Sequence, residues 1–398
     1  MLGVVGSLRS AEYPQKHAQE AADAIATLLT QRRAELLAIP SDAGHEIVDA
    51  FCRAISSELA DLLQVVGFLQ RSRLSANPFE VYDSLRRIAA ALFSKTQVRV
   101  VLSTEWEFSP YTFPAASVPS LPDYVFIGLP ASEAANMLLV PLIGHEMGHS
   151  LWVSERGDQQ YDPAVGSKLY EAIKSRWEDV QRLFPFAGNI SQLFTESSGR
   201  ARIQRLASSA LSQCEEILCD FLGLRLFGES YLQALAYMIA PSWPGERPLF
   251  YPSERQRAEY LVDAANKIGV SIPDRYLERF SERGAPPSPV RELHYSLVDS
   301  TAEALADSLW THVDALVSAA KLGLPTTHQV DEIVEELTKV VPASAPSSLS
   351  AIVSAGWQVM LKQNLWTEYP QIKDRRGTLN ELLLKSAQVL EINQRTVR

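Results

Sequence analysis

Apolar residues recur at steps of three and four over most of the chain, a period that is typical of amphipathic helices. The first helical region runs from about Tyr13 to Phe93, with Ala22, Ile25 and Leu29 on one face. Short polar or proline-containing breaks divide this region, and side chains of this kind favour helix starts. We expect caps at Ser41-Asp42 and Asn77-Pro78.

The period changes near residue 97. Gln97–Phe108 and Asp123–Leu129 are rich in β-branched and aromatic residues, which predicts two strands. The proline-rich stretch between them, Ser109–Pro122, is expected to be irregular. Helical patterns then resume, interrupted by two segments that read as loops, Ser281–Val290 and Val340–Ser350.

The segment Leu142–Trp152 contains an HExxH motif made of His145, Glu146 and His149. Residues four apart on a helix share a face, so both imidazoles can bind one Zn²⁺ while Glu146 reaches a water beside it. The flanking residues are apolar, and buried polar groups need partners such as a metal. The alternative is a pair of core histidines satisfied by other side chains.

A second acidic cluster lies on the helical pattern Ser209–Gly228. Glu216 and Asp220 are four residues apart and face the same way, while Glu215 precedes them. One carboxylate can complete a zinc site of three protein ligands, and the other can accept the spare N–H of a ligand histidine. The alternative is that these acids, Glu215 above all, form a solvated helix face.

HExxH followed by ExxxD on a later helix resembles the gluzincin metallopeptidases, the thermolysin-like group, over about Asp123–Gly269. The resemblance implies that Glu216 is the third zinc ligand and that Asp220 orients His145. The distance from His145 to Glu216 is long for thermolysin itself. It leaves room for a helical hairpin formed by Asp162–Phe184 and Ile190–Leu211.

Phe250–Leu261 is similar to a His-Pro…Arg segment of prenyl-protease-like membrane endopeptidases and their soluble relatives, with Tyr251 in place of the histidine. The similarity implies that Tyr251 donates a hydrogen bond to the oxyanion and that Arg255 or Arg257 acts as a carboxylate clamp. Alternatively the segment is a helix start with solvated arginines. His294-Tyr295 is a second candidate for the oxyanion donor.

Composition narrows the class of protein. A chain of 398 residues with 46% hydrophobic and 21% charged residues is typical of a globular protein. The formal charge of -10 argues against a nucleic-acid partner, since such binding needs clustered Lys and Arg. The apolar runs Ala134–Gly144 and Val340–Leu361 are too short or too rich in proline and serine to span a membrane.

The start of the sequence has no secretory pattern. The odd number of cysteines, Cys52, Cys214 and Cys219, predicts free thiols in a reducing compartment, each a small buried residue. We therefore expect a cytoplasmic protein.

Together these patterns predict a mainly α (α+β) fold with a helical, zincin-like metallopeptidase core and a small β-sheet. The expected regions are a helical 1–95, the core 96–295 and a helical 296–398. The strand Tyr124–Leu129 is expected to hold an extended substrate by edge pairing.

The expected function is zinc-dependent hydrolysis of a protein or peptide substrate, with Glu146 as general base. Two alternatives stay open. One is a catalytically inert zinc-bound scaffold, and the other is a regulatory protein activated by a partner. In either case the helical flanks would bind a protein partner.

Overall fold

The computed structural model describes residues 1–41, 43–73, 79–93, 98–106, 108–114, 118–185, 188–240, 246–280, 288–362 and 365–396. The fold is mainly α with a small sheet, which confirms the predicted class. The chain forms two compact units, one of residues 1–137 and 327–398 and the other of residues 138–326. These bounds differ from the three regions expected from the pattern, because the last helices belong to the same unit as the first.

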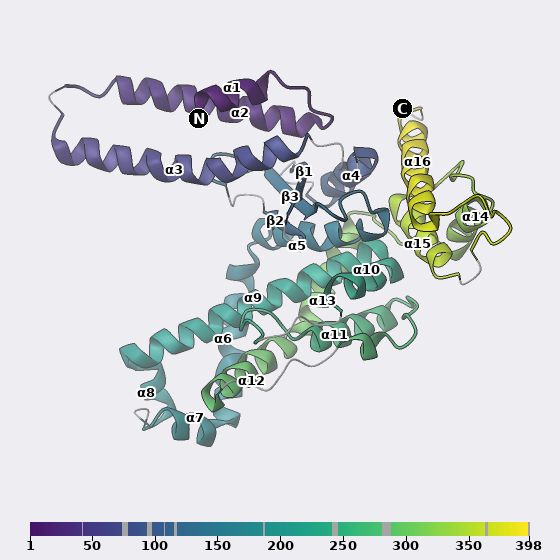
Figure 1. Cartoon of the computed structure of the whole chain (residues 1–398). Coiled ribbons are helices and arrows are strands. Elements are labelled where there is room, and N and C mark those ends of the chain that lie inside the picture. The colour runs from purple at the N-terminus through teal and green to yellow at the C-terminus, as the bar shows by residue number, and fades with distance from the viewer. Residues whose placement is uncertain are drawn as a thin grey trace. The chain divides into compact units, whose positions relative to one another are not determined.

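The first unit contains the N-terminal and C-terminal helices and the sheet (Figure 1). The expected helices between Tyr13 and Phe93 are present, and a short helix precedes them. The helix that was expected to begin at Ser41-Asp42 begins at His45, after Gly44. The helices are α1 (Leu2–Arg9), α2 (Lys16–Leu37), α3 (His45–Arg71), η1 (Phe79–Val81), α4 (Tyr82–Leu92), α14 (Thr327–Thr338), α15 (Leu349–Met360) and α16 (Arg375–Thr396).

The expected break at Val340–Ser350 joins α14 to α15 and contains no helix before Leu349. The expected Asn77-Pro78 cap and most of the Ser281–Val290 loop lie outside the described residues.

The sheet has the strand order β1-β3-β2, with β1 (Arg99–Glu105) parallel to β3 (Tyr124–Pro130) and β2 (Tyr111–Phe113) antiparallel to it. The two predicted strands are confirmed. The expectation that Ser109–Pro122 is irregular is wrong for β2, since a strand of three residues is too short to leave a period in the sequence.

The central position of β3 contradicts the expected edge pairing of a substrate on Tyr124–Leu129. Phe126, Ile127 and Gly128 pair with β1 on one side and with β2 on the other. A strand with partners on both sides has no free row of backbone N–H and C=O groups there. That binding mode is therefore excluded at these residues.

Aromatic rings hold the sheet against α3. Phe68 of α3 is fully buried, and its ring packs edge-on against Phe126 of β3 with centroids 5.4 Å apart. At β1, the buried side chain of Gln15 acts like a strand residue, since it donates to the carbonyl of Leu102 (3.0 Å) and accepts from its N–H (2.8 Å). These two hydrogen bonds satisfy backbone groups of Leu102 that would otherwise be buried without a partner.

The second unit is built around the long helix α9, against which α5, α6, α8, α10, α11, α12 and α13 pack (Figure 1). No helix of the described residues is both long and apolar enough to cross a lipid bilayer. The elements are η2 (Met137–Leu139, at the boundary), α5 (Leu142–Ser154), α6 (Gly157–Ser175), α7 (Trp177–Leu183), α8 (Ile190–Thr195), α9 (Ser197–Phe227), α10 (Glu229–Ile239), α11 (Glu254–Lys267), η3 (Tyr276–Arg279), α12 (Pro289–Glu303) and α13 (Ala306–Ala319).

All three cysteines are free, as predicted. Cys214 and Cys219 are buried on α9. Cys52 is exposed on α3, so the expectation of burial is wrong for this residue.

The packing of Phe126 predicts a large loss of stability on truncation. Replacing a fully buried phenylalanine by alanine removes apolar burial and leaves a cavity, which costs about 3–5 kcal/mol. We expect Phe126→Ala to lower the free energy of unfolding by about this amount in urea titrations followed by circular dichroism. Leu37→Ala, at a position that is 77% exposed, should stay within about 0.5 kcal/mol of wild type. A loss below about 1 kcal/mol for Phe126→Ala would contradict the tight packing of Phe126 in the core.

Candidate metal centre

Helices α5 and α9 pack closely because glycine residues lie where the two helices touch. A Cβ atom built on Gly148 would lie 2.6 Å from the Cα of Cys219, and one on Gly144 would lie 3.2 Å from the Cα of Gly223. The small residues are four apart on each helix, so they form one line of contact along both. This contact sets the two backbones close enough for side chains on their flanks to meet.

The HExxH imidazoles of α5 meet an acidic side chain of α9. Nε2 of His145 lies 3.5 Å from Oε2 of Glu216, and Nε2 of His149 lies 3.8 Å from Oε1 of the same carboxylate. His145 and Glu216 are buried, and the side chain of His149 is 17% exposed. The structure therefore brings together the three residues that the sequence pointed to as metal ligands.

A second grouping of ligand atoms shares the same histidines. Ligand atoms of His145, His149 and the buried Cys219 lie within 4.8 Å of one another, so this group could hold a metal ion. Cys219 lies on α9 between Glu216 and Asp220, with its backbone and sulfur against Gly148. The thiol was not expected at the site.

Each imidazole has its other nitrogen bound to a second carboxylate. Nδ1 of His145 donates to Oδ1 of Asp220 at 2.9 Å, and Nδ1 of His149 donates to Oε1 of Glu215 at 2.8 Å. A carboxylate is an acceptor, so Nδ1 carries a hydrogen in both rings, and each imidazole presents a lone pair at Nε2 once it has lost its second proton. Both Nε2 atoms are the ones beside Glu216.

Asp220 is the centre of a buried hydrogen-bond network. Arg257 of α11 donates to both of its oxygens at 2.7 Å, and the hydroxyl of Tyr231 of α10 donates to Oδ1 at 2.6 Å. Burial alone would raise the pKa of Asp220, but the charges of Arg257 and His145 hold it well below its ordinary value. Asp220 is therefore ionised and fixed in place.

The pKa values of His145 and Glu146 are also shifted by the charges that surround them. Burial alone would lower the pKa of His145, yet the carboxylates of Asp220 and Glu216 raise it to about 10. Burial raises the pKa of Glu146, and the charges of His145 and His149 act against that rise. Glu146 is 4% exposed and therefore lies inside the same buried cluster.

Arg257 pairs with a carboxylate of the site itself. The sequence suggested a carboxylate clamp or, alternatively, a solvated arginine at a helix start, and burial contradicts the solvated alternative. The residue is 9% exposed, and its guanidinium is paired with Asp220 and lies 3.7 Å from Glu216. The helix start itself is real, since α11 begins at Glu254 with Ser253 as its cap.

Tyr251 lies on the loop before α11 and is 39% exposed. Gln213 of α9 donates to the carbonyl of Leu249 (3.0 Å), and Arg247 donates to the carbonyl of Tyr251 (3.1 Å). Burial raises the pKa of the Tyr251 phenol, and the charge of Glu216 adds to the rise. The loop is therefore held to α9, with the phenol within the electrostatic reach of the site.

The alternative donor pair His294-Tyr295 is engaged elsewhere. His294 stacks on Phe184 with ring centroids 6.1 Å apart, and the Tyr295 hydroxyl donates to Glu246 at 2.9 Å. The charges that act on His294 come from arginines outside the metal centre. The structure does not bring this pair to the site.

Sequence reasoning missed three members of the cluster. For Glu215 the sequence left a solvated face open as an alternative and gave no role at the site, but its carboxylate accepts from Nδ1 of His149; its position beside ExxxD on a helix was the available signal. Cys219 follows Glu216 by three residues, a helical spacing that places both on neighbouring faces. Tyr231 lies on a separate helix, and nothing in the sequence links it to Asp220.

Comparisons with protein-family models, with curated proteins and with solved structures find no match for this chain. The function of this chain is therefore inferred from the geometry of the site.

The contact at Gly148 predicts a sharp effect of one added methyl group. In Gly148→Ala the Cβ would overlap the backbone of Cys219, so α5 and α9 must separate. We expect a loss of about 1–3 kcal/mol in the free energy of unfolding and a weaker affinity for Zn²⁺. Urea unfolding and competition with a chromophoric chelator measure the two quantities.

Gly166→Ala is the matched control, because a Cβ at this exposed position of α6 would meet no atom within 4 Å. It should be neutral or stabilising, since alanine favours a helix over glycine. Equal behaviour of the two variants would contradict the close contact.

Proposed function

We propose that this protein is a zinc-dependent metallopeptidase that hydrolyses peptide bonds. One observation carries the proposal. The Nε2 atoms of His145 and His149 lie beside the two oxygens of Glu216, while other carboxylates hold both Nδ1 atoms. Two imidazoles and one carboxylate are the ligand set of many catalytic zinc sites, and the fit agrees with the gluzincin resemblance of the motifs.

Glu216 is the preferred third ligand over Cys219. The carboxylate lies beside the two nitrogens that remain available, whereas the sulfur of Cys219 packs against Gly148 on the line of contact between the helices. A His, His, Glu set leaves an open position for a water or substrate.

The charge of the cluster also supports a divalent cation. The buried carboxylates of Glu146, Glu216 and Asp220 face a single buried guanidinium, that of Arg257. The raised pKa values of His145 and His149 let protonated imidazoles balance these carboxylates, but metal binding removes those protons. Uncompensated buried charge is costly, and neutral imidazoles alone would then leave an excess of negative charge. A dication held by His145, His149 and Glu216 would offset that excess.

Each polar group of the site has a role in the proposed hydrolysis. When bound, zinc acidifies water and polarises a carbonyl group. Glu146, adjacent to the first histidine, would accept the proton from the attacking water and pass it to the leaving amine. The Tyr251 hydroxyl would donate a hydrogen bond to the oxygen on which negative charge develops. Arg257 and Tyr231 would act indirectly, by fixing Asp220 and through it His145.

The ligand assignment predicts different results for two neighbouring residues. Glu216→Ala should lower the affinity for Zn²⁺ by about 100-fold or more, because loss of even an outer-shell partner costs 10–100-fold. Cys219→Ser and its control Cys214→Ser, a buried cysteine on the same helix, should keep near wild-type affinity. Chelator competition gives the affinities, and Co²⁺ substitution should show no thiolate charge-transfer band. Such a band, lost in Cys219→Ser, would assign the sulfur instead.

The general base assignment predicts loss of cleavage without loss of metal. We expect Glu146→Gln to bind one equivalent of Zn²⁺ and to cleave a denatured-proteome peptide library at least about 100-fold more slowly than wild type. Glu171→Gln, at a position whose side chain is 59% exposed, is the matched control. Identical cleavage profiles for wild type and Glu146→Gln, with zinc present in both, would reject the peptidase and favour the inert scaffold.

A further inference from the structure

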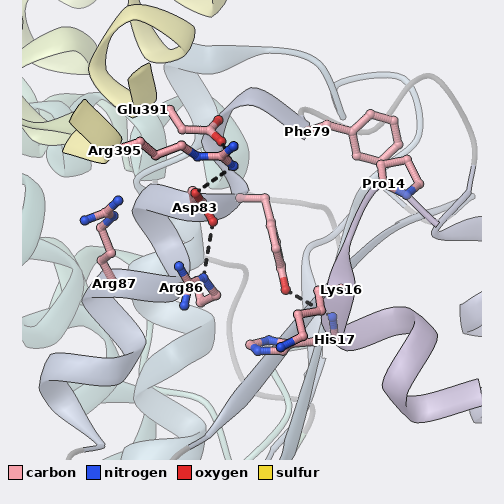
Figure 2. A pocket seen from close by; sticks show the side chains of 10 residues that line it. Pro14, Lys16, His17, Phe79, Asp83, Arg86, Arg87, Glu391 and Arg395 are labelled. Atoms are coloured by element: carbon pink, nitrogen blue, oxygen red, sulfur yellow. Dashed lines mark hydrogen bonds and ion pairs between the residues drawn. The ribbon is translucent and has the colours of Figure 1, made fainter. Parts of the chain in front are cut away.

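The first unit contains a charged cavity that the proposed peptidase does not use. It has a volume of about 560 Å³, within the usual range for small-molecule sites. Three segments far apart in the sequence form it: the start of α2, the η1–α4 region and the end of α16 (Figure 2). Its lining residues are Pro14, Lys16, His17, Phe79, Tyr82, Asp83, Arg86, Arg87, Glu391 and Arg395.

Positive charge is in excess in this cavity, although the chain as a whole carries a formal charge of -10. Lys16, Arg86, Arg87 and Arg395 line it, against the two carboxylates of Asp83 and Glu391. Three of the four cations are arginines, whose planar guanidinium groups bind phosphate oxygens in pairs.

The carboxylates leave part of this donor capacity free. Asp83 accepts from both Arg86 and Arg395 at 3.2 Å, and Glu391 forms a further ion pair with Arg395. Arg395 is thus paired with both carboxylates, whereas Arg86 shares Asp83 with it. The buried Nε of Arg87 has no hydrogen-bond partner among the residues that the structure describes.

The opposite side of the cavity is apolar and fixed. Figure 2 shows the ring of Phe79 next to Pro14, across from the arginines. Two hydrogen bonds of His17 hold the start of α2 in place. Its backbone N–H donates to the Tyr82 hydroxyl (3.3 Å), and the Nδ1 of the His17 ring donates to the carbonyl of Val100 (3.2 Å). The walls are therefore ordered around the cavity.

We propose that this cavity binds a small organic phosphate. Arg86, Arg87 and Arg395 receive the phosphate group, and Phe79 with Pro14 contacts the organic part. A phosphate carries close to two negative charges and several acceptor oxygens, which matches the excess of cationic side chains in the lining. This inference does not depend on the proposed peptidase activity.

Phenyl phosphate is the probe, because it joins a phosphate to one flat apolar ring. Titration calorimetry of the full chain at low salt should show saturable binding of one equivalent, with a Kd of about 1 mM or tighter, and weaker binding of inorganic phosphate. Arg87→Gln should weaken the binding of phenyl phosphate by about tenfold or more. Lys16→Gln should weaken it by a smaller factor, since the side chain of Lys16 is 82% exposed and solvated.

Arg53→Gln is the matched control, as its side chain on α3 is 75% exposed and outside the cavity, and it should bind like wild type. Lys16→Gln keeps the test decisive if Arg87→Gln does not fold, because substitution at so exposed a position leaves the core intact. Absence of saturable binding, or equal binding by wild type and both cavity variants, overturns the proposal. Inorganic phosphate binding as tightly as phenyl phosphate overturns the role of Phe79 and Pro14.

Discussion

The close contact between α5 and α9 is the constraint on which the candidate metal centre depends. Gly148 lies against Cys219 and Gly144 against Gly223, at distances that leave no room for a methyl group at Gly148. Carboxylate side chains of α9 can meet the imidazoles of α5 only because the backbones are this near. The glycine inside the HExxH motif is thus part of the geometry of the site, although it offers no ligand atom.

The second requirement of the proposed site is that the candidate ligands be fixed before any metal binds. Asp220 satisfies its oxygens with Arg257, Tyr231 and His145, and Glu215 holds the other imidazole. A fully bonded buried network resists rearrangement, whereas a partly bonded one would be a liability. The packing of α5 and α9 therefore brings the imidazoles and carboxylates together. The donors on α10 and α11 then fix the orientation of Asp220 and, through it, of His145.

The sequence predicted the parts of this arrangement that lie within single helices. The spacing of His145 and His149, and of Glu216 and Asp220, follows from one helical period, so each pair could be placed on one face. Tyr231 and the Gly148–Cys219 contact depend on which helices pack together, and no local pattern encodes that. The same reason explains why the union of the first and last helices in one unit, and the three-residue strand β2, were not expected.

The different environments of Arg257 and Tyr251 bear on how charge would be stabilised in the proposed reaction. A donor to the developing oxyanion must be reachable by substrate and have a hydrogen left to give. Arg257 is buried and gives both Nε and one Nη to Asp220, so its charge acts on the ligand histidine. Tyr251 is partly exposed, and its loop is tethered to α9 through backbone carbonyls, which leaves the hydroxyl out of the tether. The Tyr251 phenol is therefore the better candidate for the hydrogen-bond donor to the oxyanion. Arg257 acts by holding Asp220, and through it His145, in position.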